Sequence, residues 1–169
     1  MTRISLKDIF SLASDVVSLA TERDLTIATA ESCTGGLIGA AITSIPGSSA
    51  PFKGGIIAYD NAVKANQLDV PEAIIETHGA VSEEVAEAMA QGVLTALETD
   101  LAISVTGIAG PGGGSEEKPI GTVWIGLAQK SQPAKAALFN FGDIGRNKVR
   151  DVTCYEALKA LKAALSQAQ

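Results

Sequence analysis

Two short clusters of hydroxyl side chains, each beside glycine, could take part in chemistry in the first third of the chain. The first is AESCTGG at residues 30–36, and the second is PGSSAPF at residues 46–52. A serine becomes a nucleophile when a neighbouring base removes its proton. The next step is therefore to find which residue could supply that base to either cluster.

Only one histidine could serve as the base, because His78 is the single histidine of the chain. It lies between an expected helix end and the next helix cap, where a histidine interacts favourably with the helix dipole. A single histidine also excludes a multi-histidine metal site. The remaining candidates are two lysines, Lys64 and Lys118. The ordinary pKa of lysine is about 10.4, so a catalytic lysine must be desolvated or lie near another cation.

The second cluster contains Ser48 and Ser49, in a loop that neighbouring prolines and a glycine make irregular. A strand is expected directly after this loop. Five residues of extended chain, from Gly55 to Tyr59, advance about 13 Å. Ser48 can therefore meet Lys64 only if residues 44–53 fold back along that strand, which the sequence permits without requiring it.

The first cluster lies at an expected strand-to-helix junction. Ser32, Thr34 and the N–H groups of Gly35 and Gly36 could surround an anion there. The alternative is a helix cap, in which these groups only satisfy the first N–H groups of the helix. Cys33 could be a thiol nucleophile, but no histidine lies nearby in the sequence to lower its pKa.

Two further segments could contribute to a ligand site. The glycine-rich stretch at residues 107–122 could close over a ligand that Thr106 faces, although such a pattern is also typical of a solvent loop. Arg146 and Arg150 are one helical turn apart and could bind a phosphate or carboxylate together. Ion pairs with neighbouring aspartates are the alternative for both arginines.

The composition favours one globular domain of 169 residues with reduced cysteines. The formal net charge of −6 and the pI of about 4.8 argue against a nucleic-acid partner. The N-terminal stretch lacks the apolar core of a signal peptide, and no apolar run reaches membrane-spanning length. We therefore expect a soluble cytoplasmic protein with no membrane partner.

The hydrophobic pattern alternates between helical and strand periodicity, which predicts an α/β domain with a mixed sheet covered on both faces. Ser82 is an expected N-cap, and the segments around residues 120–129 and 135–141 are expected to form a hairpin. The other expected helices cover residues 6–20, 35–45, 61–70, 83–97 and a C-terminal segment, and the other expected strands cover residues 25–30, 54–60 and 100–110.

Several blocks of the sequence, taken in order, resemble one known family. The chain between about residues 10 and 165 is similar to the CinA C-terminal domain, the nicotinamide-nucleotide amidase family. The blocks that carry the resemblance are AESCTGG, PGSSAPFKGGIIAYDNAVK, HGAVSEEVAEAMAQGV, SVTGIAGPGGGSEEKPIGTVWIGLA and FGDIGRNKVR.

The resemblance implies a three-layer αβα sandwich with a mixed, mostly parallel sheet. It implies deamidation of nicotinamide mononucleotide to nicotinate mononucleotide and ammonia, without a metal or other cofactor. A homodimer or higher homo-oligomer is expected. We expect residues 1–169 to form one such domain, without the molybdopterin-binding-like N-terminal domain of larger family members.

The resemblance also implies roles for individual residues. Ser48 would be the nucleophile and Lys64 its base, with Tyr59 orienting the lysine or carrying its proton. The family's TYSNEAK block reads AYDNAVK here, so Tyr59, Asn61 and Lys64 are kept while their neighbours differ. The residues expected to bind the nucleotide are Ser32, Thr34, Gly35, Gly36, Ser49, Thr106 and Arg146, the last through the phosphate.

Two other hypotheses use the same residues differently. The chain could be a nucleotide-sensing or competence-associated protein that binds its ligand without turnover. Alternatively, Cys33 could carry the amidase chemistry, in which case alkylation of the thiol would abolish activity and Ser48→Ala would not.

Overall fold

The computed structural model describes residues 4–168, which form a sheet covered by helices on both faces. Its elements, in chain order, are α1 (Leu6–Glu22), β1 (Ile27–Glu31), α2 (Leu37–Thr43), β2 (Phe52–Ile57), α3 (Asn61–Leu68), α4 (Glu72–His78), α5 (Glu83–Ala96), β3 (Leu101–Gly107), β4 (Thr122–Gln129), β5 (Lys135–Asn140) and α6 (Arg146–Gln167). The expected α/β fold is confirmed.

The five strands form one mixed sheet in the order β2-β1-β3-β4-β5. Strand β1 pairs in parallel with both β2 and β3, whereas β4 runs antiparallel to β3 and β5. The predicted hairpin is therefore the β4–β5 pair. Because β1, β2 and β3 point the same way, their carboxyl ends meet at one edge of the sheet.

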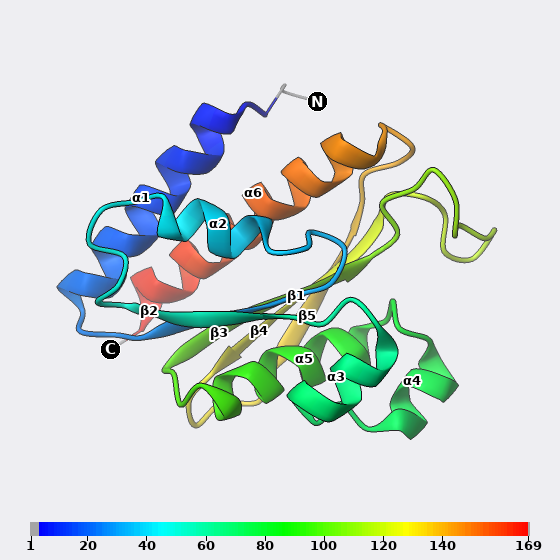
Figure 1. Ribbon diagram of the computed structural model, residues 1–169, viewed down its shortest axis with the longest axis horizontal. Helices are drawn as coiled ribbons and strands as arrows, with labels where there is room; N and C mark the ends of the chain where they lie inside the picture. The colour runs from blue at the N-terminus through cyan, green and yellow to red at the C-terminus, as the bar shows by residue number, and fades with distance from the viewer. Residues whose placement is uncertain (1–3, 169) are drawn as a thin grey trace.

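Two helical layers enclose this sheet, as Figure 1 shows. Helices α1, α2 and α6 cover one face, and α3, α4 and α5 lie on the other. Each face has its own buried cluster, with Ile9, Ile42 and Leu161 in the first and Leu68, Met89 and Val93 in the second. The expected three-layer arrangement is confirmed.

The helix boundaries follow from local capping and from apolar stripes. Ser5 and Asp8 form a reciprocal capping box at the start of α1, and the side chain of Ser82 caps α5 as expected. Helix α3 begins at Asn61 but is capped by Asp60, whose carboxylate accepts from the Ala62 N–H. No helix within residues 4–168 combines the length and apolarity needed to cross a membrane.

Strand direction separates the two serine clusters. Ser32 directly follows β1, at the carboxyl edge of the parallel strands. Ser48 precedes β2, and the Ile27 N–H at the start of β1 donates to the carbonyl of Pro51. Since the six residues of β2 span about 17 Å, the two clusters lie at opposite edges of the sheet.

Candidate active site

A cavity of about 240 Å³ opens at the carboxyl edge of β1, β2 and β3. This is where ligands commonly bind to open α/β sheets. Strand ends, the start of α3, the loop before α5 and the start of α6 all contribute to its wall. The lining residues are Ser32, Cys33, Tyr59, Asn61, Lys64, Ala80, Val81, Thr106, Gly107, Ala109 and Arg146.

Lys64 is the most unusual side chain in this wall, because it is only 1% exposed. Its Nζ lies 3.3 Å from Ser32 Oγ and 3.2 Å from the carbonyl oxygen of Tyr59. Burial lowers the pKa of the Lys64 ammonium below its ordinary value, and the nearby carboxylate of Asp60 opposes this in part. Lys64 therefore has the surroundings that a lysine general base needs.

Ser32 is held at the point where β1 turns toward α2. Its N–H donates to the carbonyl of Val105 on β3, and its own carbonyl accepts from the Gly35 N–H, both at 3.0 Å. The side chain is 8% exposed and faces the cavity beside Lys64. Ser32 was expected to bind substrate, but its hydroxyl is also the serine hydroxyl within reach of the buried amine.

The expected pairing of Ser48 with Lys64 is wrong in this structure. Residues 45–51 form consecutive turns, with Ser48 N–H donating to Ile45 and Phe52 N–H donating to Ser48. The loop does not fold back along β2, so Ser48 and Ser49 stay at the opposite edge of the sheet. Neither residue lines the cavity that contains Lys64.

The expected anion cradle around the start of α2 is already filled by a carboxylate of the chain itself. Glu31 is 1% exposed, and its Oε2 accepts from Thr34 Oγ1 and from the N–H groups of Gly36 and Ile38. Its Oε1 accepts from the N–H of Gly39 at 2.8 Å. These groups serve as an internal helix cap, so the interpretation of Thr34 and Gly36 as phosphate ligands is corrected.

The glycines of this turn are needed for its shape. Gly35 and Gly36 both have positive φ, at 61° and 95°. A Cβ at Gly36 would lie 3.0 Å from Ile57 Cδ1, so a side chain there would press on the end of β2. Gly35 and Gly36 do not line the cavity, and they shape the turn that presents Ser32.

Cys33 lines the cavity but has the surroundings of an unreactive thiol. It is buried, and this burial raises its pKa to about 12. The thiolate is the nucleophilic form of cysteine, so a raised pKa disfavours the reaction at neutral pH. This supports the serine hypothesis over the thiol hypothesis.

Tyr59 and Arg146 close the outer side of the cavity. The Arg146 guanidinium donates to the Tyr59 hydroxyl and to the carbonyl of Gly110, both at 2.8 Å. The carbonyl of Tyr59 orients Lys64, whereas its ring is 59% exposed and its hydroxyl faces Arg146. Tyr59 thus contacts the Lys64 amine through its backbone carbonyl and not through its side chain.

The two arginines of α6 differ in what they contact. Arg150 donates to the carbonyl of Thr34 and fixes the turn after β1. Arg146 alone of the two lines the cavity, one turn earlier on the helix. No ion pair joins either arginine to an aspartate among the residues that the structure describes.

Thr106 lines the cavity as expected, at the end of β3, and is 1% exposed. Its hydroxyl donates to the carbonyl of Ala80 at 2.7 Å, so it also holds the loop that precedes α5. The contributions of Ala80 and Val81 to the wall were not anticipated. Small and apolar loop residues carry no sequence signal for a site, which explains why they were missed.

Metal ligands are not grouped anywhere in residues 4–168, because no three His, Cys, Asp or Glu side chains lie close enough to share an ion. The polar groups of the cavity are instead a lysine amine, an arginine guanidinium, an amide and hydroxyls. These groups suit acid–base chemistry on a small polar ligand.

Known proteins resemble this chain in both sequence and fold. A CinA-like protein from Synechocystis is 54% identical over 156 residues, which is 92% of this chain and 38% of that protein. The chain spans little more than a third of the curated relatives it matches, 36% of one and 38% of another.

Solved structures match over nearly the whole chain. The crystal structure of the competence/damage inducible protein CihA from Agrobacterium tumefaciens has a TM-score of 0.92 and 42% identity, covering 99% of this chain and all of that one. The competence damage-inducible protein A from Klebsiella pneumoniae has a TM-score of 0.90 and 32% identity, covering 95% and 99%. The sequence matches the CinA C-terminal domain family over residues 9–165, and the chain belongs to that family.

Proposed function

We propose that this protein is an amidohydrolase that deamidates nicotinamide mononucleotide by a serine–lysine mechanism, with Ser32 as the nucleophile. The observation that carries the proposal is the buried Lys64 amine, 3.3 Å from Ser32 Oγ in the wall of the cavity. A hydroxyl next to an amine of lowered pKa is the arrangement that an activated serine requires.

In the first step, neutral Lys64 takes the proton of Ser32, and Ser32 Oγ attacks the carboxamide carbon. Lys64 then returns the proton to the amide nitrogen, the C–N bond breaks and ammonia leaves. In the second step, water attacks the ester of Ser32 while Lys64 accepts a water proton. The acid is released and the Ser32 hydroxyl is restored.

The tetrahedral intermediate needs donors for its negative oxygen. The N–H groups of Cys33 and Thr34 follow Ser32 directly, and neither donates to a backbone carbonyl among residues 4–168. The N–H after the nucleophile contributes to the oxyanion hole in other strand-to-helix nucleophile turns. We assign this role to the same turn here, where one well-placed donor would lower the activation barrier by about 3 kcal/mol.

The size of the cavity fits the reacting part of the substrate. An apolar cavity of about 150 Å³ is enough to bind benzene. The 240 Å³ space beside Ser32 is therefore large enough for a pyridine carboxamide. The ribose and phosphate would extend past the mouth, where Arg146 is the lining side chain with a permanent positive charge.

The direct test is release of ammonia by the purified chain, with nicotinamide mononucleotide and free nicotinamide as alternative substrates. We expect release from the nucleotide, with a much lower kcat/KM for the free base because it lacks the group that Arg146 would bind. A preference for the free base would contradict the role of Arg146.

The same experiment separates the enzyme from a binding module. Saturable binding of the nucleotide, measured by calorimetry, with no ammonia released would instead support the nucleotide-sensing hypothesis. Alkylation of the wild-type protein provides the control for Cys33, and full activity after modification of that thiol would exclude it as the nucleophile.

A further inference from the structure

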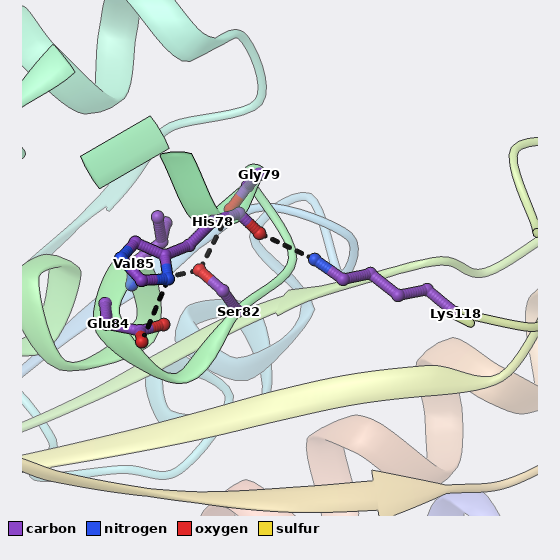
Figure 2. A network of polar contacts seen from close by, with 6 residues as sticks. All are labelled: His78, Gly79, Ser82, Glu84, Val85 and Lys118. Atoms are coloured by element: carbon purple, nitrogen blue, oxygen red, sulfur yellow. Dashed lines mark hydrogen bonds and ion pairs between the residues drawn. The ribbon is translucent and has the colours of Figure 1, made fainter. Parts of the chain in front are cut away.

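The glycine-rich segment between β3 and β4 is held at two points, by Arg146 of the cavity wall and by His78, two residues before Ala80. Near its start, the carbonyl of Gly110 accepts from Arg146. Near its end, Lys118 Nζ donates to the carbonyl of His78 at 2.6 Å, as Figure 2 shows. Residues 111–117 between these points are exposed.

The local shape of the segment directs Lys118 toward this contact. Ser115 N–H donates to the Lys118 carbonyl at 2.9 Å, and Lys118 N–H donates to Ser115 Oγ at 3.0 Å. These two bonds close a tight turn at residues 115–118. The Lys118 amine then reaches the last residue of α4, where a cation is also favoured by the helix dipole.

The receiving segment has each of three consecutive carbonyls held by a different side chain. The carbonyl of His78 accepts from Lys118, that of Gly79 from Ser82, and that of Ala80 from Thr106. Ser82 and Thr106 belong to the buried frame of α5 and β3. Lys118 is therefore the one of the three that comes from the exposed glycine-rich segment.

The residue after His78 leaves room for this amine. Gly79 has a φ of 78°, and a Cβ built on it would lie 3.3 Å from Lys118 Nζ. The next two residues, Ala80 and Val81, line the cavity. The Lys118 contact is therefore only two residues of backbone away from the wall that faces Ser32 and Lys64.

We propose that Lys118 is a positioning residue that ties the glycine-rich segment to the end of α4 and so fixes the Ala80–Val81 wall. It does not contact the reacting atoms, and it acts through the carbonyl of His78. The effect on catalysis rests on the function proposed above. The attachment of the glycine-rich segment to His78 through Lys118 does not depend on that function.

The test compares Lys118→Met, Lys118→Arg and wild type, with Lys130→Met as the control because Lys130 is exposed and away from the cavity. The first readout is cleavage after Glu116 or Glu117 by a glutamate-specific protease, mapped by mass spectrometry. Loss of one charge-assisted hydrogen bond should accelerate this cleavage about fivefold in Lys118→Met, because cleavage follows the population of the opened segment. Lys118→Arg should restore slow cleavage, since its guanidinium can donate to the same carbonyl.

The second readout is the kinetics of ammonia release. The Lys118→Met variant should raise KM several-fold while kcat stays within about twofold, the pattern of lost binding without lost chemistry. Unchanged cleavage in Lys118→Met would overturn the proposal, and so would a fall in kcat with KM unchanged. If wild type releases no ammonia, the proposed function fails, but the cleavage experiment still decides the role of Lys118.

Discussion

The carboxyl edge and the amino edge of the parallel strands each carry a serine cluster, and their surroundings differ. At the carboxyl edge, Ser32 faces a buried amine in a cavity whose mouth holds Arg146. At the amino edge, Ser48 lies in a series of turns outside that cavity. A serine becomes reactive through the groups around it, so the edge on which it lies matters more than the residues beside it in sequence.

This difference follows from strand direction. Ser32 directly follows β1, and Lys64 lies in α3, which begins after the carboxyl end of the neighbouring parallel strand β2. Residues that follow adjacent parallel strands are brought to the same edge. Ser48 precedes β2, so the full length of that strand separates it from Lys64.

The largest expected effect on activity comes from replacing Ser32, and replacing Ser48 provides the comparison. Ser32→Ala should lower kcat for ammonia release by about 10³-fold or more, because removal of a nucleophile leaves only the binding site and oxyanion donors. Ser48→Ala should keep kcat within about twofold. The measurement is steady-state ammonia release by both variants, with circular dichroism to check that each is folded.

Removal of the base should give a similar loss of activity. Lys64→Met should lower kcat by about 10²-fold or more, in the range expected for loss of a general base. In the proposed mechanism, the neutral amine of Lys64 is the active form, and burial lowers the pKa of that amine. The kcat/KM should therefore rise with pH along a limb centred below about 10.4, the ordinary value for lysine. A limb centred at or above that value would contradict the assigned base.

The same substitution should raise stability. The folded protein binds the Lys64 proton less tightly than the unfolded chain, since its folded pKa is lowered. The buried ammonium therefore destabilises the fold below the folded pKa, and this effect disappears as pH rises toward about 10.4. Lys64→Met should melt at a higher temperature than wild type at neutral pH, with a gap that narrows as the pH is raised. A variant that melts lower at every pH would show that the amine supports the fold.

The buried carboxylate of Glu31, the residue before Ser32, is expected to affect stability. Glu31→Gln keeps the volume but turns an amide NH₂ toward groups that donate hydrogen bonds, because the Glu31 carboxylate accepts four of them. We expect a loss of about 2 kcal/mol in the free energy of unfolding, measured by urea denaturation. The control is Glu22→Gln on the exposed end of α1, which should change stability by less than about 0.5 kcal/mol. Equal effects of the two substitutions would show that the internal cap contributes little.

The smallest expected effect is on substrate binding, and it should differ between the two arginines of α6. Arg146→Met should raise KM for the nucleotide about tenfold, because it removes the guanidinium at the mouth of the cavity. Arg150→Met should lower the melting temperature and leave KM nearly unchanged, since Arg150 binds the carbonyl of Thr34. Steady-state kinetics and thermal denaturation of both variants distinguish these roles. Similar increases in KM would place both side chains on the substrate.

Much of the fold could be predicted from the sequence because its signals are local. The stripe of α6 that ends in Leu158, Leu161 and Leu165 is buried, and the Ser82 cap is where the pattern placed it. The apolar run after Asp100 becomes the buried strand β3. Periodicity and capping depend on neighbours within a few residues, so they need no knowledge of the tertiary structure.

The site could be predicted only in part, because its polar groups have partners far away in sequence. Lys64, Thr106 and Arg146 line the cavity, and all three were among the expected site residues, Lys64 through the family resemblance. The sequence did not predict that the Glu31 carboxylate fills the turn before α2, because hydrogen bonds to backbone N–H groups leave no pattern in the sequence. The missing information was that β1 and β2 pair in parallel, which places Ser32, and not Ser48, at the same edge as Lys64.

The most direct test of the central claim is to find which side chain carries the acyl group during turnover. The protein would be quenched in acid while it hydrolyses nicotinamide mononucleotide and then digested with trypsin. The peptide covering residues 24–53 contains Ser32, Cys33 and Ser48 together, so fragmentation of this one peptide by tandem mass spectrometry locates the added mass. We predict an ester of the nicotinate nucleotide on Ser32. The same group on Ser48, or on the thiol of Cys33, would contradict the mechanism.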